Sequence, residues 1–146
     1  MAMVIAERSL CDRDKIGAVV VSRQNRIVDT GYNGPPRGMP REETGCVNWC
    51  PRAKRSSLDP AYDDCHALHA EVNALTSTDR AQREGGTIYV SSGVCGSCAK
   101  LIANSGLVRV VCDTIHSASP QFAHRSSGKW FAWLTLCGLQ VEEMKH

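Results

Sequence analysis

The chain has 146 residues, of which 42% are hydrophobic and 22% charged, and its formal net charge is +2. This length predicts a single domain, 1–146, with a sizeable buried core, and the composition is that of an ordinary globular chain. The small net charge gives no support for a basic nucleic-acid-binding surface, so no nucleic-acid partner is expected.

The apolar start of the chain, residues 1–6, is followed at once by Glu7 and Arg8. This stretch is too short for a signal sequence or a membrane span, so it predicts a short helix and no membrane contact. Eight cysteines would suit a disulfide scaffold in a small secreted chain. Without a signal sequence, they favour metal ligands and buried thiols in a reducing cytoplasm.

A β-hairpin is the first pair of elements expected after this helix. Residues 16–21 form a β-branched apolar run that predicts a buried strand, residues 23–25 turn the chain, and residues 26–32 return as the antiparallel partner. From residue 33 to about 64, prolines, glycines and scattered charges predict one long loop. A compact domain seldom carries such a loop unless it is functional or pinned, and its cysteines suggest pinning.

Two helices and a strand are expected in the middle of the chain. The first helix should run from about 68 to 78, and the apolar, β-branched residues 87–91 should form the strand. The second helix should start near Gly96 and end at the Asn-Ser-Gly sequence of residues 104–106, which suits a left-handed cap.

The C-terminal part predicts a strand, a helix and a last strand. Residues 107–112 form an apolar run typical of a buried strand. The helix carries apolar residues at i, i+3, i+4 and i+7, which are Trp130, Trp133, Leu134 and Cys137, and Gly138 stops it before a strand over 139–141. A hairpin followed by alternating helices and strands predicts an α/β fold, with helices on both faces of a central sheet.

A metal-binding pattern with a spare carboxylate lies in this middle part, where His69-Ala70-Glu71 is followed by Cys95-Gly96-Ser97-Cys98. Structural zinc sites are closed by four protein ligands, whereas catalytic sites have three and keep a position for water. His69, Cys95 and Cys98 supply three ligands, and Glu71 is left to move protons. The order H-x-E and then C-x-x-C is typical of zinc-dependent nucleobase deaminases.

The expected helices place these ligands where two helix N-termini meet. A helix N-terminus stabilises anions and lowers the pKa of a thiol, and zinc lowers the pKa of a bound water from about 15.7 to about 7. Glu71 would take the proton of this water, protonate a ring nitrogen of an aminopyrimidine and later protonate the leaving amine. A closed structural zinc site, or a redox C-x-x-C pair beside a core histidine, is the alternative, but neither explains Glu71.

The motifs extend over more than two thirds of the chain, from about residue 9 to residue 112. They comprise residues 11–21, 30–38 with Gly-Tyr-Asn-Gly-Pro, 65–74 and 95–106. In these residues the chain resembles the deoxycytidylate (dCMP) deaminases, a branch of the zinc-dependent cytidine deaminase superfamily.

This resemblance implies a three-layer α/β/α sandwich with a five-stranded mixed sheet. It also implies a zinc-dependent hydrolase that converts dCMP to dUMP and ammonia in pyrimidine nucleotide metabolism, feeding thymidylate synthesis. Members of this branch are often homohexamers that dCTP activates and dTTP inhibits, so these assemblies and effectors are expected by resemblance.

Three substrate contacts are carried over from the resemblance. Asn33 would bind the sugar hydroxyl, the backbone of Ala70 would bind the base edge, and Arg80, nine residues after Glu71, would bind the phosphate. The alternatives are that Asn33 only forms a tight turn with Gly34, and that Arg80 is a cation placed at the C-terminus of a helix.

Four cysteines outside the catalytic set suggest a second metal site. Relatives can carry a structural zinc built from the entry to the first strand, the long loop and the residues before the catalytic helix. Those places hold Cys11, Cys46, Cys50 and Cys65, and His66 could replace one of them. Buried free thiols are the alternative for the four. The remaining pair, Cys112 and Cys137, is expected in the core.

The chain departs from the family in one residue beside the metal centre. Members usually have proline before the first zinc cysteine, whereas this chain has Val94. Because proline fixes φ there, the change affects the shape of the base pocket. The alternative substrates are therefore a 5-modified dCMP, another nucleotide or a free base. A different class, a non-catalytic zinc-stabilised nucleic-acid-binding module, is disfavoured by the weak charge and the 5% aromatic content.

Overall fold

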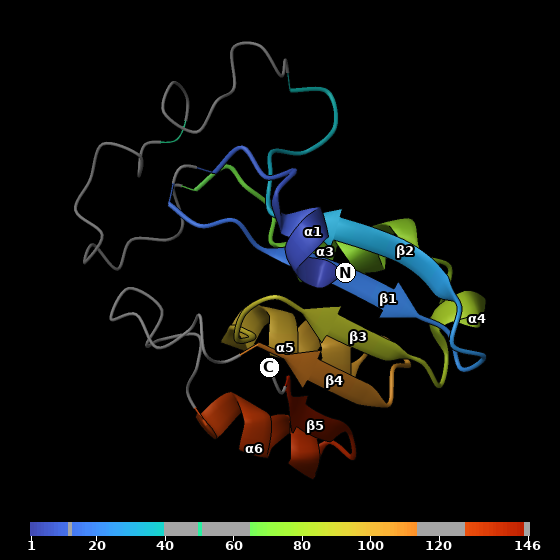
Figure 1. The fold of residues 1–146 in the computed structure, drawn as a ribbon. Coiled ribbons are helices and arrows are strands. Elements are labelled where there is room, and N and C mark those ends of the chain that lie inside the picture. Colours follow the sequence, from blue (N-terminus) through green and yellow to red (C-terminus); the bar gives the residue numbers. More distant parts are fainter. Residues whose placement is uncertain (12, 40–49, 51–64, 114–127, 145–146) are drawn as a thin grey trace.

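The computed structural model describes residues 1–11, 13–39, 50, 65–113 and 128–144 of the chain (Figure 1). Most of the predicted long loop, with Cys46, lies outside the described residues. The described elements are, in chain order, α1 (Ala2–Ala6), β1 (Gly17–Val21), β2 (Ile27–Tyr32), α3 (Ala70–Ser77), α4 (Arg80–Arg83), β3 (Thr87–Val90), α5 (Gly96–Ala103), β4 (Arg109–Cys112), α6 (Gly128–Leu136) and β5 (Gln140–Glu143).

The five strands form one mixed sheet in the order β2-β1-β3-β4-β5, as expected. Strand β1 is antiparallel to both β2 and β3, whereas β3, β4 and β5 run parallel to one another. Helix α5 connects β3 to β4, so its N-terminus lies at the carboxyl ends of the parallel strands. In open α/β sheets this edge is where ligands bind.

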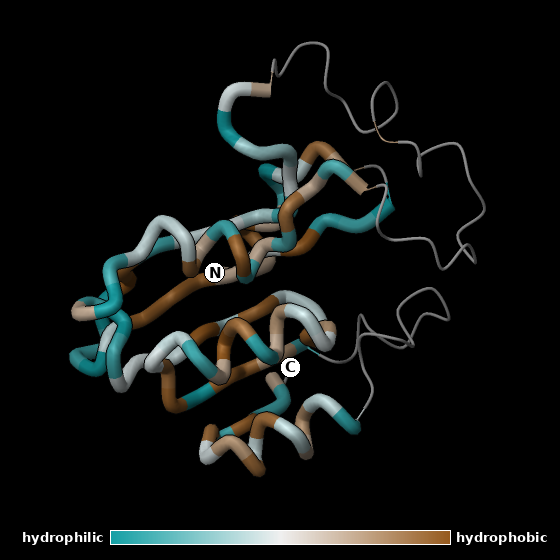
Figure 2. Tube along the Cα trace, turned by 180° about the vertical axis from the view of Figure 1, so that it is seen from behind, coloured by the Kyte–Doolittle hydropathy of each residue, from teal (hydrophilic) through white to brown (hydrophobic). Residues whose placement is uncertain are grey.

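Helices cover both faces of the sheet. Alternate residues of β1 point to opposite faces: Ala18 and Val20 join the large apolar cluster formed with α3 and α5, while Gly17 faces α1. Helix α6 packs against α5 and β5, and its buried Leu134 belongs to the same cluster. The hydropathy colours of Figure 2 show apolar segments concentrated on the strands between the helices. The predicted α/β/α arrangement is confirmed.

Two glycines allow helices to lie directly on the sheet. A Cβ atom at Gly17 would overlap the carbonyl oxygen of Ala2 in α1, and a Cβ at Gly31 would overlap that of Ala70 in α3. Only glycine permits such close backbone contact. The second contact is important for the site, because Ala70 lies between His69 and Glu71.

The structure corrects the predicted boundaries and one predicted core residue. The first long helix begins at Ala70, not near residue 68, because Leu68 is paired with Gly34 in an isolated β-bridge. The prediction that Cys137 lies in the core is wrong: Cys137 is exposed. Helix α6 ends at Leu136, so Cys137 lies one residue beyond the helix whose apolar spacing predicted its burial. No helix among the described residues is long and apolar enough to cross a membrane.

Candidate metal centre and active site

Two helix N-termini carry the predicted metal ligands. His69 is the N-cap residue of α3, Cys95 is the N-cap residue of α5, and Cys98 lies in the first turn of α5. Helix α3 is fixed at its start by backbone hydrogen bonds between Gly34 and Leu68, with N···O distances of 3.1 and 2.8 Å. The β-bridge therefore holds the residue directly before His69.

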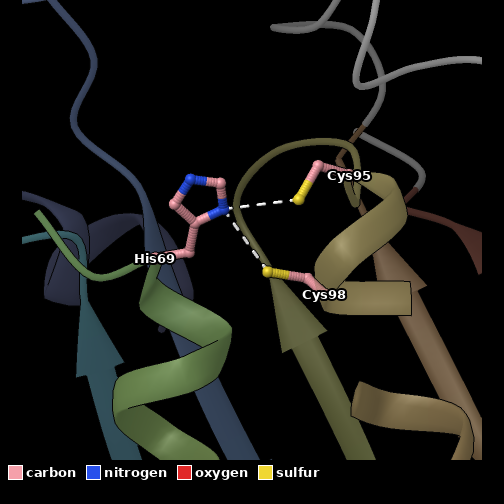
Figure 3. A group of neighbouring side chains, drawn as sticks. All are labelled: His69, Cys95 and Cys98. Atoms are coloured by element: carbon pink, nitrogen blue, oxygen red, sulfur yellow. Dashed lines mark hydrogen bonds between the residues drawn. The ribbon is translucent and has the colours of Figure 1, made fainter. Parts of the chain in front are cut away.

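The three side chains meet in a geometry that suits zinc. The Nδ1 atom of His69 lies 3.4 Å from the sulfur of Cys95 and 3.4 Å from that of Cys98 (Figure 3). All three donor atoms lie within 4.8 Å of one another, and among the described residues this is the group that could hold a metal ion. Zinc–sulfur bonds of about 2.3 Å and zinc–nitrogen bonds of about 2.0 Å at tetrahedral angles place sulfur and nitrogen about 3.5 Å apart. Both nitrogen–sulfur distances match this value, so the three donors suit zinc.

The two sulfur atoms share one proton in the metal-free protein. Hydrogen bonds that the Cys95 thiolate accepts, first from Cys98 and then from His69, outweigh the effect of burial and lower the pKa of Cys95 to about 3. The hydrogen bond to Cys95, burial and the charge of Glu71 raise the pKa of Cys98 far above its ordinary value. One thiolate is therefore formed before any metal binds, and zinc would displace the proton of the second.

Glu71 is a buried carboxylate beside the metal donors but outside their group. It is the second residue of α3, its side chain is 3% exposed, and it is hydrogen-bonded to Cys98. The N-terminal turn of a helix favours a negative charge at this position. A carboxylate held next to three metal donors, yet not needed as a fourth, can transfer protons.

A cleft of about 450 Å³ opens over the metal donors. Leu68 and Val72 of the α3 side and Trp130 of α6 give it apolar walls, and Lys100 brings a positive charge to its lining. Trp130 lies against Gly96, where a Cβ atom would collide with the indole ring. The apolar spacing of its helix predicted Trp130 only as one of a set of apolar residues, and nothing in the sequence indicated that Trp130 and Lys100 line the same cleft. Local patterns do not relate residues on two different helices.

The structure places Asn33 and Ala70 near the start of α3. Asn33 is buried; its Oδ1 accepts a hydrogen bond from the Ile16 N–H at 2.8 Å, and its Nδ2 donates to the Asp14 carbonyl at 2.7 Å. The side chain thus joins the entry of β1 to the end of β2. Ala70 is fully buried between His69 and Glu71. The substrate contacts assigned to both residues stay predictions.

Arg80 is not among the described residues that line the cleft. It begins α4, beyond the C-terminal end of α3, while His69 lies at the other end of that helix. Its side chain is 63% exposed, and its Nε donates to the Glu84 carboxylate at 2.9 Å. Its role in phosphate binding stays a prediction.

Two of the cysteines expected at a second zinc site, Cys50 and Cys11, lie near a third, Cys65. Cys65 is hydrogen-bonded to Cys50, and both Cys50 and Cys11 contribute to the electrostatic environment of its thiol. Burial, above all, raises the pKa of the Cys65 thiol. Cys46 lies outside the described residues, and His66, the predicted substitute, is exposed.

Comparison with known proteins agrees with this site. Residues 1–114 match the family described as the cytidine and deoxycytidylate deaminase zinc-binding region. A deoxycytidylate deaminase of Mycobacterium phage D29 is 44% identical over 118 residues, covering 76% of this chain and 87% of the relative. The human deoxycytidylate deaminase is 32% identical over 127 residues, covering 86% of this chain and 68% of the relative.

Solved structures show the same relationship. The dCMP deaminase of cyanophage S-TIM5, crystallised in complex with dCMP and dUMP, is 26% identical to this chain, with a TM-score of 0.68. The match covers 98% of this chain and 90% of the phage protein. The chain belongs to the cytidine and deoxycytidylate deaminase zinc-binding family.

Proposed function

We propose that the metal centre of His69, Cys95 and Cys98, together with Glu71, carries out the hydrolytic deamination of dCMP to dUMP and ammonia. The observation that supports this most directly is the buried Glu71 carboxylate beside three metal donors that it does not join. The relatives named deoxycytidylate deaminase, at up to 44% identity, support the same substrate. The protein is a zinc-dependent hydrolase that acts on the C–N bond of a cyclic amidine.

Glu71 is the proton carrier of the reaction. When bound, zinc lowers the pKa of the water that it coordinates from about 15.7 to about 7. Glu71 would accept a proton from the attacking water and deliver it to the ring nitrogen of cytosine. It would then take the remaining proton from the hydroxyl group added to the ring carbon and pass it to the amine as the C–N bond breaks. Ammonia leaves, and the carbonyl of dUMP remains. The burial of Glu71 keeps its proton from exchanging freely with bulk water.

We further propose the substrate contacts of Asn33, Ala70 and Arg80 that the resemblance implies. Asn33 supports this role because each of its amide atoms retains capacity for one more hydrogen bond after pairing with the backbone. Ala70 supports it by its place between a metal donor and the proton carrier. Arg80 would have to exchange its exposed pairing with Glu84 for the phosphate.

The substrate is tested by measuring ammonia release from dCMP, CMP, dCTP, deoxycytidine and 5-methyl-dCMP with the zinc-loaded protein. Turnover of dCMP well above that of deoxycytidine is expected. A preference for 5-methyl-dCMP would identify the modified nucleotide as the substrate. Oligonucleotide binding that survives Glu71→Gln, with no release of ammonia from any compound, would instead favour a non-catalytic nucleic-acid-binding module.

We propose a second, structural zinc ion held by Cys11, Cys46, Cys50 and Cys65. The clustering of Cys11, Cys50 and Cys65 supports it, since thiols from three separate segments converge without a disulfide among the described cysteines. A closed four-thiolate site contributes directly to folding. It would also fix the chain four residues before His69.

Regulation by dCTP and dTTP, a homohexameric assembly and a cytoplasmic location also remain proposals. A second hollow, of about 340 Å³, supports an effector site, because Arg37 lines it together with Tyr32 and Asn73. The Asn73 side chain donates to the Tyr32 carbonyl at 2.8 Å, and Asn73 follows Glu71 by two residues in α3. A ligand in this hollow would therefore contact the catalytic helix.

A further inference from the structure

All four polar groups of Asn33 are bonded to residues that lie between α1 and the first residue of β1. The Asn33 N–H donates to the Ile16 carbonyl at 3.0 Å, and the side-chain amide pairs with the Ile16 N–H and the Asp14 carbonyl. The fourth group, the backbone carbonyl of Asn33, accepts a hydrogen bond from the Ser9 hydroxyl at 2.7 Å. These three residues therefore decide where Asn33 lies.

Ser9 is a buried residue whose hydroxyl group makes two hydrogen bonds. It is 3% exposed, and besides donating to Asn33 its hydroxyl oxygen accepts the N–H of Cys11 at 3.2 Å. The Ser9 N–H donates to the carbonyl of Ala6, the last residue of α1, at 2.9 Å. Because the hydroxyl is engaged both as a donor and as an acceptor, its orientation is fixed. The Asn33 carbonyl thus has a rigidly held partner.

Asn33 lies one residue from the chain segment that leads to the metal donors. It directly follows β2, and the next residue, Gly34, forms the β-bridge with Leu68. Leu68 lines the cleft and directly precedes His69. Ser9 is not among the described residues that line the cleft. An influence of Ser9 on the site would therefore be exerted through the position of Asn33.

We propose that Ser9 is a positioning residue for substrate recognition: its buried hydroxyl anchors the Asn33 backbone and so holds the Asn33 amide where the sugar hydroxyl of the nucleotide binds. The inference rests on the proposed function, and in particular on the contact between Asn33 and the sugar. Without the Ser9 hydroxyl, the buried Asn33 carbonyl loses its donor, and the backbone gains by shifting toward another partner. Selectivity for the sugar hydroxyl should then be lost, while the deamination chemistry is retained.

The test measures how strongly the zinc-loaded protein distinguishes dCMP from 2′,3′-dideoxy-CMP, which lacks the sugar hydroxyl. One neutral hydrogen bond changes affinity by about 2- to 12-fold, so the native kcat/KM should favour dCMP by about tenfold. In Ser9→Ala this preference should fall to about twofold or less, because KM for dCMP rises while kcat changes little. Ser9→Thr retains the hydroxyl and should retain the preference.

Ser105→Ala is the matched control, because Ser105 makes the same kind of bonds far from the cleft. Ser105 is buried, and its hydroxyl donates to the Ile102 carbonyl at 2.6 Å and accepts the Leu107 N–H at 3.3 Å. It lies beyond the C-terminal end of α5, whereas Cys95 caps the other end of that helix. Both alanine variants should lower stability in denaturant unfolding, but Ser105→Ala should leave the preference for dCMP at its native value.

Equal preferences in Ser9→Ala and Ser105→Ala would overturn the proposal and leave Ser9 a purely structural residue. Should Ser9→Thr lose the preference because its extra methyl group does not fit, the comparison of the two alanine variants still decides. A native protein that does not distinguish the two nucleotides would refute the contact of Asn33 with the sugar, and the inference with it. Absence of ammonia release from dCMP would instead refute the proposed function; the preference is then measured as the ratio of the dissociation constants of the two nucleotides.

Discussion

Strand β2 and helix α3 meet backbone to backbone at Gly31 and Ala70. A Cβ atom on Gly31 would overlap the Ala70 carbonyl oxygen and would lie only 2.5 Å from the Ala74 nitrogen. Nothing flexible separates the strand from the helix at this point. The first turn of α3 can therefore lie this close to the sheet only because residue 31 of β2 is glycine. The same contact fixes where Glu71 lies relative to the metal donors.

Replacing this glycine should shift the catalytic helix. Gly31→Ala is expected to cost about 1–3 kcal/mol of unfolding free energy, as overpacking of a core does, and to lower kcat/KM for dCMP. Denaturant unfolding and steady-state kinetics measure the two effects. Gly128→Ala is the matched control, because nothing lies within 4 Å of a Cβ at that position. Equal behaviour of the two variants would show that α3 tolerates displacement.

The carboxylate of Glu71 should be essential for turnover and dispensable for metal binding. Glu71→Gln keeps the size of the side chain but removes its ability to accept and return a proton. The rate should fall by at least the factor of about 10²–10⁴ attributed to general acid–base catalysis, since the residue acts more than once. Metal analysis should give an unchanged zinc content. Substantial ammonia release by this variant would show that another group moves the protons.

The chemistry of the site could be predicted from the sequence because it depends on residue types at short spacings. His69 and Glu71 are two residues apart, Cys95 and Cys98 three, and each pair occupies the start of one helix. Helix caps and local motifs are local properties of the chain, so they can be inferred before the fold is known. The alternation of helices and strands likewise predicted a central sheet with helices on both faces.

Contacts between distant segments could not be predicted in this way. The backbone pairing of Gly34 with Leu68, which holds the start of α3, joins two segments that are far apart in the sequence, and no local pattern relates them. Cys112 lies in the core, as its apolar surroundings in the sequence predicted. The wrong prediction that Cys137 is buried has a local cause. The helical spacing of apolar residues includes Cys137, but the helix ends one residue earlier.

The metal-free protein should contain one unusually reactive thiol in its active site. The pKa of Cys95 is lowered to about 3, chiefly by the hydrogen bond from Cys98, so the thiolate form persists as the pH falls from neutral to about 3. After zinc is removed, iodoacetamide should label Cys95 at pH 5, and added zinc should protect it. Peptide mapping measures the labelling, and the exposed Cys137 provides an internal comparison. Labelling that zinc does not change would exclude Cys95 as a ligand.

Arg83 should stabilise the fold far more than its neighbour Arg80. Its guanidinium group donates to the carbonyl groups of Ser105 at 2.9 Å, Leu75 at 3.2 Å and Thr78, and so connects the ends of α3 and α5. Arg83→Met leaves these acceptors without a donor and is expected to cost about 1–3 kcal/mol in denaturant unfolding. Arg80→Met, which removes only an exposed pair, should cost about 0.5 kcal/mol or less. Equal losses would contradict this assignment.

Metal counting should distinguish a structural zinc from buried free thiols at Cys65. The native protein is expected to hold two zinc ions per chain, and Cys65→Ser should hold one while its active-site zinc remains. Because a closed thiolate site contributes to folding, the variant should also unfold at lower denaturant concentration. Cys137→Ser is the matched control, since it removes an exposed thiol that is not expected to bind either zinc ion. A single zinc ion in the native protein, with Cys65 readily alkylated, would show that the cluster consists of free thiols.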